Sequence, residues 1–440
     1  MSAGWADTVL WWHVYPLGFT GAPVRPETAE QVPVPRLDRL HAWLDHVVEL
    51  GLNGLALGPV FASQTHGYDT VDHLRVDPRL GTEDDLRRLI DACHERGIRV
   101  LLDGVFNHVG RGHPAFAQLE ADGPSAPTAG LFRVDWTGWR PGDPVRADVF
   151  EGHEQLVALD HSSPAVADLV VGVMRHWLDR GVDGWRLDAA YVVPPEFWAR
   201  VLPEVRRTHP DAWFSGEVIH GDAAAVVRAS TMDSLTQYEL WQGLWHGLAE
   251  RNFFETAHAL QRHNGLLAAF VPSTFVGNHD VTRIASAVGP DLVPHALAVL
   301  FTVAGVPSVY AGDEYGWTGV KEQRVGGDDA VRPEFPPRPP DPGELDAGAR
   351  SLLEAHRELI ALRRRHPWLV RAHTDVVQLA NEQVVLRSGT AGEAVVVALN
   401  LGGAPIELPA ADATALACGN GRLAGGRVSL PARGWAVLTG

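Results

Sequence analysis

The feature that most constrains the fold is an alternation of short apolar runs with longer amphipathic segments, which continues from Trp5 to about Ile360. Short runs rich in β-branched residues predict strands, and segments with apolar residues every three to four positions predict helices. Strands that alternate with helices build a parallel sheet, and eight such units favour a closed (β/α)8 TIM barrel. We place the eight strands at Val9–Tyr15, Gly54–Leu57, Ile98–Asp103, Gly184–Asp188, Trp213–Glu217, Ser234–Gln237, Ser273–Gly277 and Pro307–Tyr310.

Helix signals stand between these strands. Thr82 is placed to cap a helix whose first turn is acidic, and glycine directly follows three of the predicted helices. We expect helices at Arg36–Leu50, Thr82–Arg96, Ser163–Arg180, Glu196–Arg207 and Asp346–His366.

Two regions break the alternation. Residues 109–160 are rich in Gly, Pro, Asp and Trp, and they follow the third strand. The chain after residue 370 is instead a series of short alternating strands with glycine turns. We therefore predict a barrel formed by residues 1–108 and 161–370, an inserted small domain at 109–160, and a C-terminal β-sandwich at 371–440.

The charge balance excludes two classes of partner. The chain has 37 Lys and Arg against 54 Asp and Glu, a net charge of -17. Such an excess repels phosphate backbones and anionic lipids, so we expect no nucleic-acid and no membrane partner. The longest apolar stretch, Ala296–Tyr310, is too short to span a bilayer and predicts a buried helix followed by a strand. No basic residue precedes Arg25, which argues against a secretory signal and favours a cytoplasmic protein.

Polar clusters stand where four of the predicted strands stop. The third strand runs into DGVFNH (103–108), the fourth into GWRLD (184–188), the fifth into GEV (216–218) and the seventh into GNHD (277–280). A single carboxylate in such a place is more often a helix cap or a surface residue. Because the carboxyl ends of the strands form the active face of a barrel, four clusters together predict one shared pocket.

The residue types in these clusters point to carboxylate chemistry. Acidic side chains without a lysine or a metal-ligand motif suit acid/base and nucleophilic catalysis, as in glycoside hydrolysis. Arg186 shares a strand face with Asp188, so we expect it to keep Asp188 ionised with a low pKa. Glu217 has no cation within two residues and has apolar neighbours, which predicts a raised pKa and a proton donor.

At these motifs the sequence resembles the α-amylase family, glycoside hydrolase family 13. The four clusters are similar to the family's conserved regions in order and spacing, and GYD at 67–69 and GDE at 312–314 are similar to two accessory ones. DGVFNH followed by LDHSSP (159–164) is most similar to the neopullulanase, cyclomaltodextrinase and α-glucosidase-like members.

The resemblance implies roles for individual residues. Asp188 is then the nucleophile, Glu217 the general acid/base and Asp280 the transition-state stabiliser. The residues that surround the reacting sugar are Tyr68, as a stacking platform, with His108, Arg186 and His279. The implied enzyme is a retaining hydrolase that cleaves α-1,4 bonds of small α-glucan oligosaccharides without a cofactor.

The chain departs from the family pattern at two places. Tyr191 and Val192 stand where α-amylases carry a Lys-His pair, and the first β/α loop lacks an acidic metal-binding segment. We therefore expect no catalytic metal; the acidic residues to consider for calcium are Asp135, Asp143 and Asp148 of the insert. Asp328, Asp329 and Arg332, in the loop after the eighth strand, are further candidates for substrate binding.

Some alternatives stay open. Trp11, Trp12, Trp241 and Trp245 could stack on sugars, although packing is the favoured interpretation. A transglycosylase or isomerase would use the same covalent intermediate. A non-catalytic sugar-binding protein could keep the barrel, but the intact set of three acidic residues argues against it.

Overall fold

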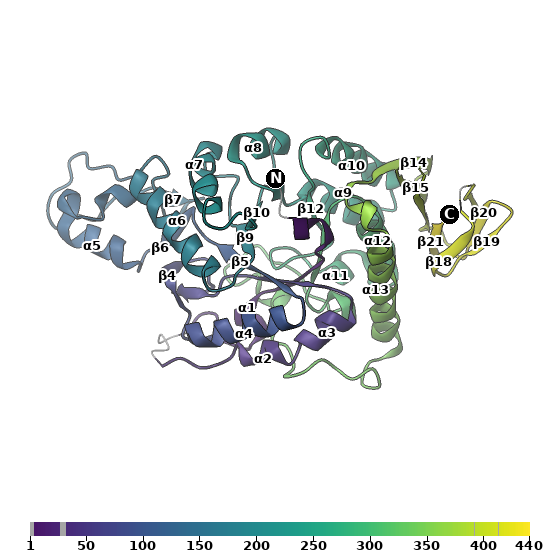
Figure 1. Ribbon diagram of the computed structural model, residues 1–440, viewed down its shortest axis with the longest axis horizontal. Helices are drawn as coiled ribbons and strands as arrows, with labels where there is room; N and C mark the ends of the chain where they lie inside the picture. The colour runs from purple at the N-terminus through teal and green to yellow at the C-terminus, as the bar shows by residue number, and fades with distance from the viewer. Residues whose placement is uncertain (1–3, 27–31, 391, 412) are drawn as a thin grey trace.

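The computed structural model describes residues 4–26, 32–390, 392–411 and 413–440. Eight parallel strands form its central sheet in the order β11-β10-β9-β5-β2-β1-β13-β12 (Figure 1). A bridge between Thr236 and Ser273 joins the two end strands and closes the barrel, which confirms the predicted (β/α)8 architecture. The strands are β1 (Trp11–Val14), β2 (Gly54–Leu57), β5 (Arg99–Gly104), β9 (Gly184–Leu187), β10 (Trp213–Gly216), β11 (Ser234–Leu235), β12 (Ser273–Phe275) and β13 (Val306–Tyr310).

Helices surround the sheet. Thr82 is the N-cap of α4, as the sequence predicted, and it forms a capping box with Asp85. The Ala296–Tyr310 stretch lies in a buried helix and the strand β13, also as predicted. The main helices are α4 (Glu83–Glu95), α6 (Pro164–Leu178), α7 (Pro195–Arg206), α8 (Ala223–Ser230), α9 (Tyr238–Ala249), α10 (Phe253–Leu266), α12 (Val293–Thr302) and α13 (Ala347–Arg365).

The prediction of a single helix at Arg36–Leu50 was wrong. The chain forms two short helices there, α2 (Asp38–His41) and α3 (Leu44–Glu49). Trp43 lies between them and is fully buried: its ring stacks on Trp12 at 5.8 Å, and its Nε1 donates to the carbonyl of Pro336 at 3.2 Å. We attribute the break to this anchoring of Trp43, because tertiary packing overrides local helix propensity.

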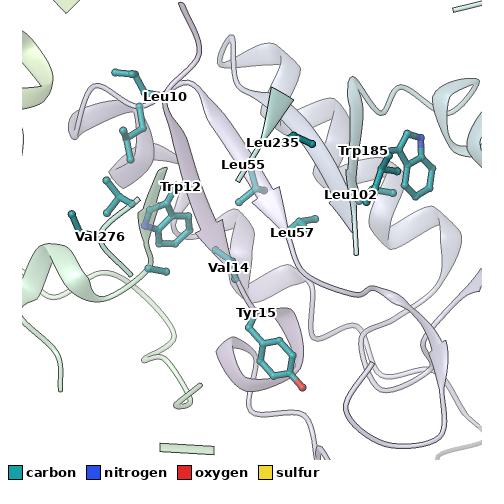
Figure 2. Packing of buried hydrophobic residues seen from close by; sticks show 14 of the residues in the cluster. Leu10, Trp12, Val14, Tyr15, Leu55, Leu57, Leu102, Trp185, Leu235 and Val276 are labelled. Carbon is teal, nitrogen blue, oxygen red and sulfur yellow. The ribbon is translucent and has the colours of Figure 1, made fainter. Parts of the chain in front are cut away.

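Side chains along each barrel strand alternate between two cores. Trp12 and Val14 point outward and pack between the sheet and the helices, together with residues such as Leu55 and Trp185 (Figure 2). Trp11 belongs to a second cluster with Leu101 and Trp213, in which the two indole rings stack at 5.7 Å. Packing is thus confirmed for Trp11 and Trp12.

Small sheets flank the barrel after its second and third strands. The hairpin β3 (Phe61–Ser63) and β4 (Thr70–Val76) was not predicted, and the segment between its strands carries Tyr68. At the predicted insert the chain forms an antiparallel sheet in the order β6-β8-β7, and α5 (Pro114–Asp122) lies between β6 and β7 in the sequence. Its strands are β6 (His108–Gly110), β7 (Val149–Phe150) and β8 (His153–Ala158).

The C-terminal region is a β-sandwich beyond α13 (Figure 1). A five-stranded antiparallel sheet, β14-β15-β16-β21-β18, packs against a three-stranded one, β17-β20-β19, around a small apolar core that includes Val385, Leu408 and Val428. In the described part of the chain, no helix has the length and apolar character needed to cross a membrane. The strands are β14 (His373–Leu379), β15 (Gln383–Gly389), β16 (Ala394–Asn400), β17 (Ile406–Pro409), β18 (Ala415–Gly419), β19 (Arg422–Ala424), β20 (Arg427–Leu430) and β21 (Trp435–Thr439).

Candidate active site

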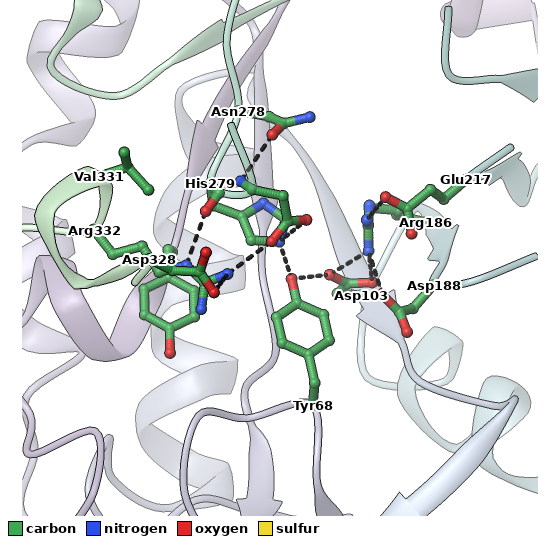
Figure 3. Close-up of polar contacts among 12 residues, drawn as sticks. Tyr68, Asp103, Arg186, Asp188, Glu217, Asn278, His279, Asp328, Val331 and Arg332 are labelled. Atoms are coloured by element: carbon green, nitrogen blue, oxygen red, sulfur yellow. Dashed lines mark hydrogen bonds and ion pairs between the residues drawn. The ribbon is translucent and has the colours of Figure 1, made fainter. Parts of the chain in front are cut away.

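Arg186 is the centre of a charged cluster at the carboxyl end of the barrel (Figure 3). Its Nη1 donates to both carboxylate oxygens of Asp103, at 2.7 and 2.8 Å, and to Oδ1 of Asp188 at 3.2 Å. Its Nη2 lies 2.9 Å from Oε1 of Glu217. Strands β5, β9 and β10 are neighbours in the sheet, so their ends bring these residues to one guanidinium.

Glu217 does not lie in the apolar environment expected from its sequence neighbours. Its Oε1 accepts a hydrogen bond from the Tyr238 hydroxyl at 3.0 Å in addition to the ion pair with Arg186. Its Oε2 accepts the backbone N–H of Ala189 at 3.1 Å. The expected apolar environment of Glu217 was wrong. All three donors come from outside its own strand, and the sequence next to Glu217 does not reveal them.

The expected low pKa of Asp188 was also wrong. Burial raises the pKa of this carboxyl well above its usual range, although the charge of Arg186 acts in the opposite direction. The negative charges of Glu217 and Asp103 raise it further. Three carboxylates share one guanidinium, so Arg186 compensates only part of the cost of ionising Asp188.

Asp280 lies on the other side of the site and has its own cation. Its Oδ1 accepts from Nη2 of Arg332 at 2.7 Å, and its Oδ2 lies 2.9 Å from Nε2 of the buried His279. Desolvation alone raises the pKa of Asp280, but His279 and Arg332 outweigh it and lower the pKa well below its usual range. Arg332 also lies 3.2 Å from Asp328 and above the ring of Tyr15.

Tyr68 connects the two sides of the cluster. Its hydroxyl hydrogen-bonds to Nε2 of His279 and donates to Oδ2 of Asp103 at 3.2 Å. Its ring is nearly parallel to that of His279, with centroids 5.5 Å apart. Nε2 of His108 donates to the carbonyl of Tyr68 at 3.0 Å, and burial lowers the pKa of His108 to about 4, so its imidazole is neutral at neutral pH.

The structure thus brings the residues predicted as catalytic and those predicted to surround the sugar to one end of the barrel. Sequence reasoning missed Tyr238, Tyr15 and the ion pair between Arg332 and Asp280. Asp329 instead pairs with Arg25 at 2.9 Å. Local sequence carries no signal for these contacts, because each joins residues from different strand ends or loops.

The acidic residues of the insert do not form a calcium site. Asp135 accepts the backbone N–H of Thr137, Asp143 accepts that of Arg140, and Asp148 lies 3.4 Å from Arg133. Across the described ranges of the chain, no group of three or more His, Cys, Asp or Glu side chains is arranged to hold a metal. The three carboxylates of the insert therefore have separate partners, and the chemistry below is derived without a metal ion.

Comparison with known proteins identifies the family. The family description "Alpha amylase, catalytic domain" matches residues 36–336. The chain belongs to the α-amylase family. It is 29% identical to a maltogenic α-amylase of Bacillus acidopullulyticus over 83% of this chain and 64% of that relative. It is 31% identical to neopullulanase 2 of Thermoactinomyces vulgaris over 75% of this chain and 56% of the relative. The chain thus spans less than two thirds of the length of these curated relatives.

A solved structure in the family is similar over the whole chain. It is the cyclic α-maltosyl-(1→6)-maltose hydrolase of Arthrobacter globiformis, with a TM-score of 0.83, 25% identity and full coverage of both chains. The motifs that resemble the α-amylase family are also those whose side chains meet around Arg186 and His279. The family assignment and the geometry therefore point to the same end of the barrel.

Proposed function

We propose that this α-amylase family member is a retaining hydrolase that cleaves α-1,4-glucosidic bonds of short maltooligosaccharides through a covalent glucosyl-enzyme intermediate. The observation that carries the proposal is the guanidinium of Arg186, which contacts the carboxylates of both Asp188 and Glu217. Retaining glycosidases need two carboxyl groups about 5–5.5 Å apart, and a shared cation keeps two such groups close. A cytoplasmic setting, expected from the sequence, stays part of the proposal.

The first step forms the covalent intermediate. A carboxylate oxygen of Asp188 attacks the anomeric carbon while the carboxyl of Glu217 gives its proton to the glycosidic oxygen, which leaves with the bonding electrons. Asp188 must be ionised to attack. Arg186 favours that state, and its second nitrogen holds Glu217 beside the same bond.

The second step releases the sugar. The carboxylate of Glu217 takes a proton from water, whose oxygen attacks the anomeric carbon, and the bond to Asp188 breaks. Two displacements at one carbon restore the original anomeric configuration. Asp280, held ionised by His279 and Arg332, is placed to bind sugar hydroxyls and to stabilise positive charge at the transition state.

The relatives support the substrate class. Two of them are named a maltogenic α-amylase and a neopullulanase, and the structural neighbour is named a hydrolase of a cyclic maltosyl-maltose. We extend these names to short, linear α-1,4-linked glucans as part of the proposal. A transglycosylase would use the same intermediate with a sugar hydroxyl in place of water, and the experiment below separates the two outcomes.

The test is a product analysis. The protein is incubated with maltose, maltotriose, cyclodextrin, pullulan, isomaltose, trehalose and sucrose, and the first-formed anomer is recorded by proton NMR. We expect cleavage of maltotriose with the α-anomer formed first. A β-anomer formed first would indicate inversion, longer products would indicate transfer, and no reaction with any glucan would overturn the proposal. Trapping with a fluorinated glucoside should add one sugar mass to the peptide that contains Asp188.

A further inference from the structure

A buried ion pair lies next to the loop that carries Asp280. Arg283 directly precedes the short helix α11 (Ile284–Val288), and Asp313 begins the 3-10 helix that follows β13. Nη1 of Arg283 donates to Oδ1 of Asp313 at 2.7 Å and to the carbonyl of Ala311 at 3.0 Å. The exposed fractions of the two charged side chains are 0% and 2%. The proposed mechanism gives neither residue a role.

The hydrogen bonding of this pair is incomplete. Within the described part of the chain, Nε and Nη2 of Arg283 and Oδ2 of Asp313 are buried without a hydrogen-bond partner. Burial raises the pKa of Asp313 to about 7, although the charge and the hydrogen bond of Arg283 lower it. The attraction between two buried charges repays their desolvation only when their remaining donors and acceptors are satisfied. Stability is therefore a poor explanation for this pair.

The pair joins two loops at the carboxyl end of the barrel. A Cβ atom built on Gly277 would lie 2.8 Å from Oδ2 of Asp313, so the backbone of the loop after β12 fits closely against this carboxylate. The backbone N–H of Arg283 donates to the carbonyl of Gly319 at 3.0 Å. The N–H of Gly319 donates in turn to Oγ of Ser286 at 2.9 Å. The loop after β12 is thus attached at several points to the loop after β13.

Both loops contribute residues to the site. The loop after β12 carries His279 and Asp280, and the loop after β13 continues to Arg332. Nη2 of Arg332 donates to Asp280 at 2.7 Å, and its Nε donates to the carbonyl of His279 at 2.9 Å. Figure 3 shows His279 and Arg332 together on the side of the cluster away from Glu217. The ion pair of Asp280 therefore depends on how these two loops lie against each other.

Tyr310 at the end of β13 connects the buried pair to Arg332. The guanidinium of Arg283 lies above the ring of Tyr310, 4.3 Å from its centroid. The hydroxyl of Tyr310 donates to the carbonyl of Val331 at 2.8 Å, and Val331 directly precedes Arg332. One side chain thus contacts both the arginine of the buried pair and the backbone next to the arginine that binds Asp280.

We propose that the ion pair of Arg283 and Asp313 positions Asp280. It fixes the loop after β12 against the loop after β13, and so brings Asp280 to Arg332 beside the reacting sugar. The inference rests on the proposed function, which gives Asp280 its role at the transition state. Both members of the pair are positioning residues, because they act through Asp280 and not on the sugar.

The test separates catalysis from stability. Arg283→Met leaves Asp313 without its partner and should lower the Tm. Arg283→Met/Asp313→Leu replaces both charges by apolar side chains, so its Tm should lie above that of the single variant. The kcat/KM for maltotriose should nevertheless be lowered on the order of 10–100-fold in both, because a misplaced group loses rate even in a folded protein. Arg283→Lys keeps a cation beside Asp313 and should lose less activity than Arg283→Met.

The matched control is Arg363→Met, at the opposite end of the same strand. Arg363 is a buried arginine of α13, and its guanidinium donates to the carbonyls of Val303 and Gly305 at 2.5 and 2.6 Å. Gly305 directly precedes β13. Arg363→Met should also lower the Tm, but kcat/KM measured well below the Tm should stay within about twofold of the wild type.

A second readout follows the effect through Asp280. In the otherwise unmodified enzyme, Arg283→Met/Asp313→Leu should lower kcat/KM for p-nitrophenyl α-glucoside on the order of 10–100-fold. In an Asp280→Asn background, the same two changes should lower the residual kcat/KM by no more than about twofold, because the group that the pair positions has already lost its charge.

Two results would overturn the proposal. Recovery of kcat/KM together with the Tm in Arg283→Met/Asp313→Leu would show that the pair only supports the fold. An equal loss of activity with and without the carboxylate of Asp280 would show that the pair acts elsewhere. If Arg283→Met is too unstable to assay, the double variant has no unpaired charge and still decides both points. Failure of the proposed function is seen separately, because the unmodified enzyme would then cleave no glucan.

Discussion

Nη2 of Arg186 in β9 lies 2.9 Å from Oε1 of Glu217, the residue that directly follows the neighbouring strand β10. The register of β9 and β10 places Arg186 opposite Ser215, so Glu217 stands two residues further toward the open end. The same guanidinium bonds to Asp188 on its own strand. One cation therefore contacts both carboxyl groups that the proposed double displacement uses.

The first prediction concerns these two carboxyl groups. Asp188→Asn and Glu217→Gln should each lower kcat/KM for maltotriose by about 10²–10⁴-fold or more, because each removes a positioned nucleophile or acid/base group. Both side chains lie at strand ends outside the apolar cores, so circular dichroism should show an intact fold. A folded Glu217→Gln variant with near-normal activity on an unactivated glucoside would contradict the assignment.

Sequence was sufficient for the barrel and for the carboxyl ends of its strands, because the apolar periodicity is local and the motifs directly follow the strands. It was also sufficient for the contact between Arg186 and Asp188, since residues two apart in a strand face the same way. Sequence reasoning failed for hydrogen-bond and ion-pair partners that lie on other strands or on distant loops. Tyr238 follows the next strand, and Arg332 lies far along the chain from Asp280. Such contacts depend on the closed barrel and on the path of long loops, which local patterns do not encode.

The pKa of Asp188 predicts an unusual effect on stability. The pKa of Asp188 is higher in the folded protein than in the unfolded chain, where it is near ~4. Its contribution to the free energy of unfolding is therefore complete below pH ~4 and is lost as the pH rises through the folded-state pKa. In the Asp188→Asn variant the side chain at position 188 is uncharged at every pH, so the Tm of the variant at pH 7 should exceed that of the wild type. Thermal denaturation at several pH values should show the difference shrinking toward pH ~4. A lower Tm at pH 7 would contradict this reasoning.

Asp280 should behave in the opposite way. Because its folded pKa is lowered, its stabilising contribution is present above an unfolded value near ~4 and is lost as the pH falls through the folded pKa. Asp280→Asn should therefore lower the stability at pH 7, by about 1–3 kcal/mol, the usual cost of removing one partner of a hydrogen-bonded charge. Denaturant unfolding at pH 7 measures this change in the free energy of unfolding. An unchanged or higher stability would argue against the ion pair with Arg332.

Arg332 should affect catalysis through Asp280. Its Nε donates to the carbonyl of His279 at 2.9 Å while its Nη2 bonds to Asp280, and a lysine has only one nitrogen for both positions. We expect Arg332→Lys to lower kcat/KM about 10–100-fold. Arg338→Lys, an exposed arginine of the same loop, is the control and should stay within about twofold. Equal effects of the two changes would show that the geometry of Arg332 is unimportant.

The last prediction concerns linkage preference and rests on Ala189, which follows Asp188, the proposed nucleophile. Its side chain is buried, its N–H donates to Glu217, and its φ is 46°, a conformation in which a β-branched residue is strained. We expect the methyl group of Ala189 to leave room beside the scissile bond for an α-1,4-linked leaving group, so maltotriose should be cleaved faster than isomaltose and than soluble starch. Two added methyl groups in a packed wall are worth about 1–3 kcal/mol, so Ala189→Val should narrow the difference between the cleavage rates of maltotriose and isomaltose and also lower the Tm.

The control is Ala189→Gly, which accepts this φ without strain and should keep the preference for maltotriose. Faster cleavage of isomaltose by the wild type, or an unchanged ratio in a folded Ala189→Val variant, would show that this position does not set the linkage, while the retaining mechanism would stand.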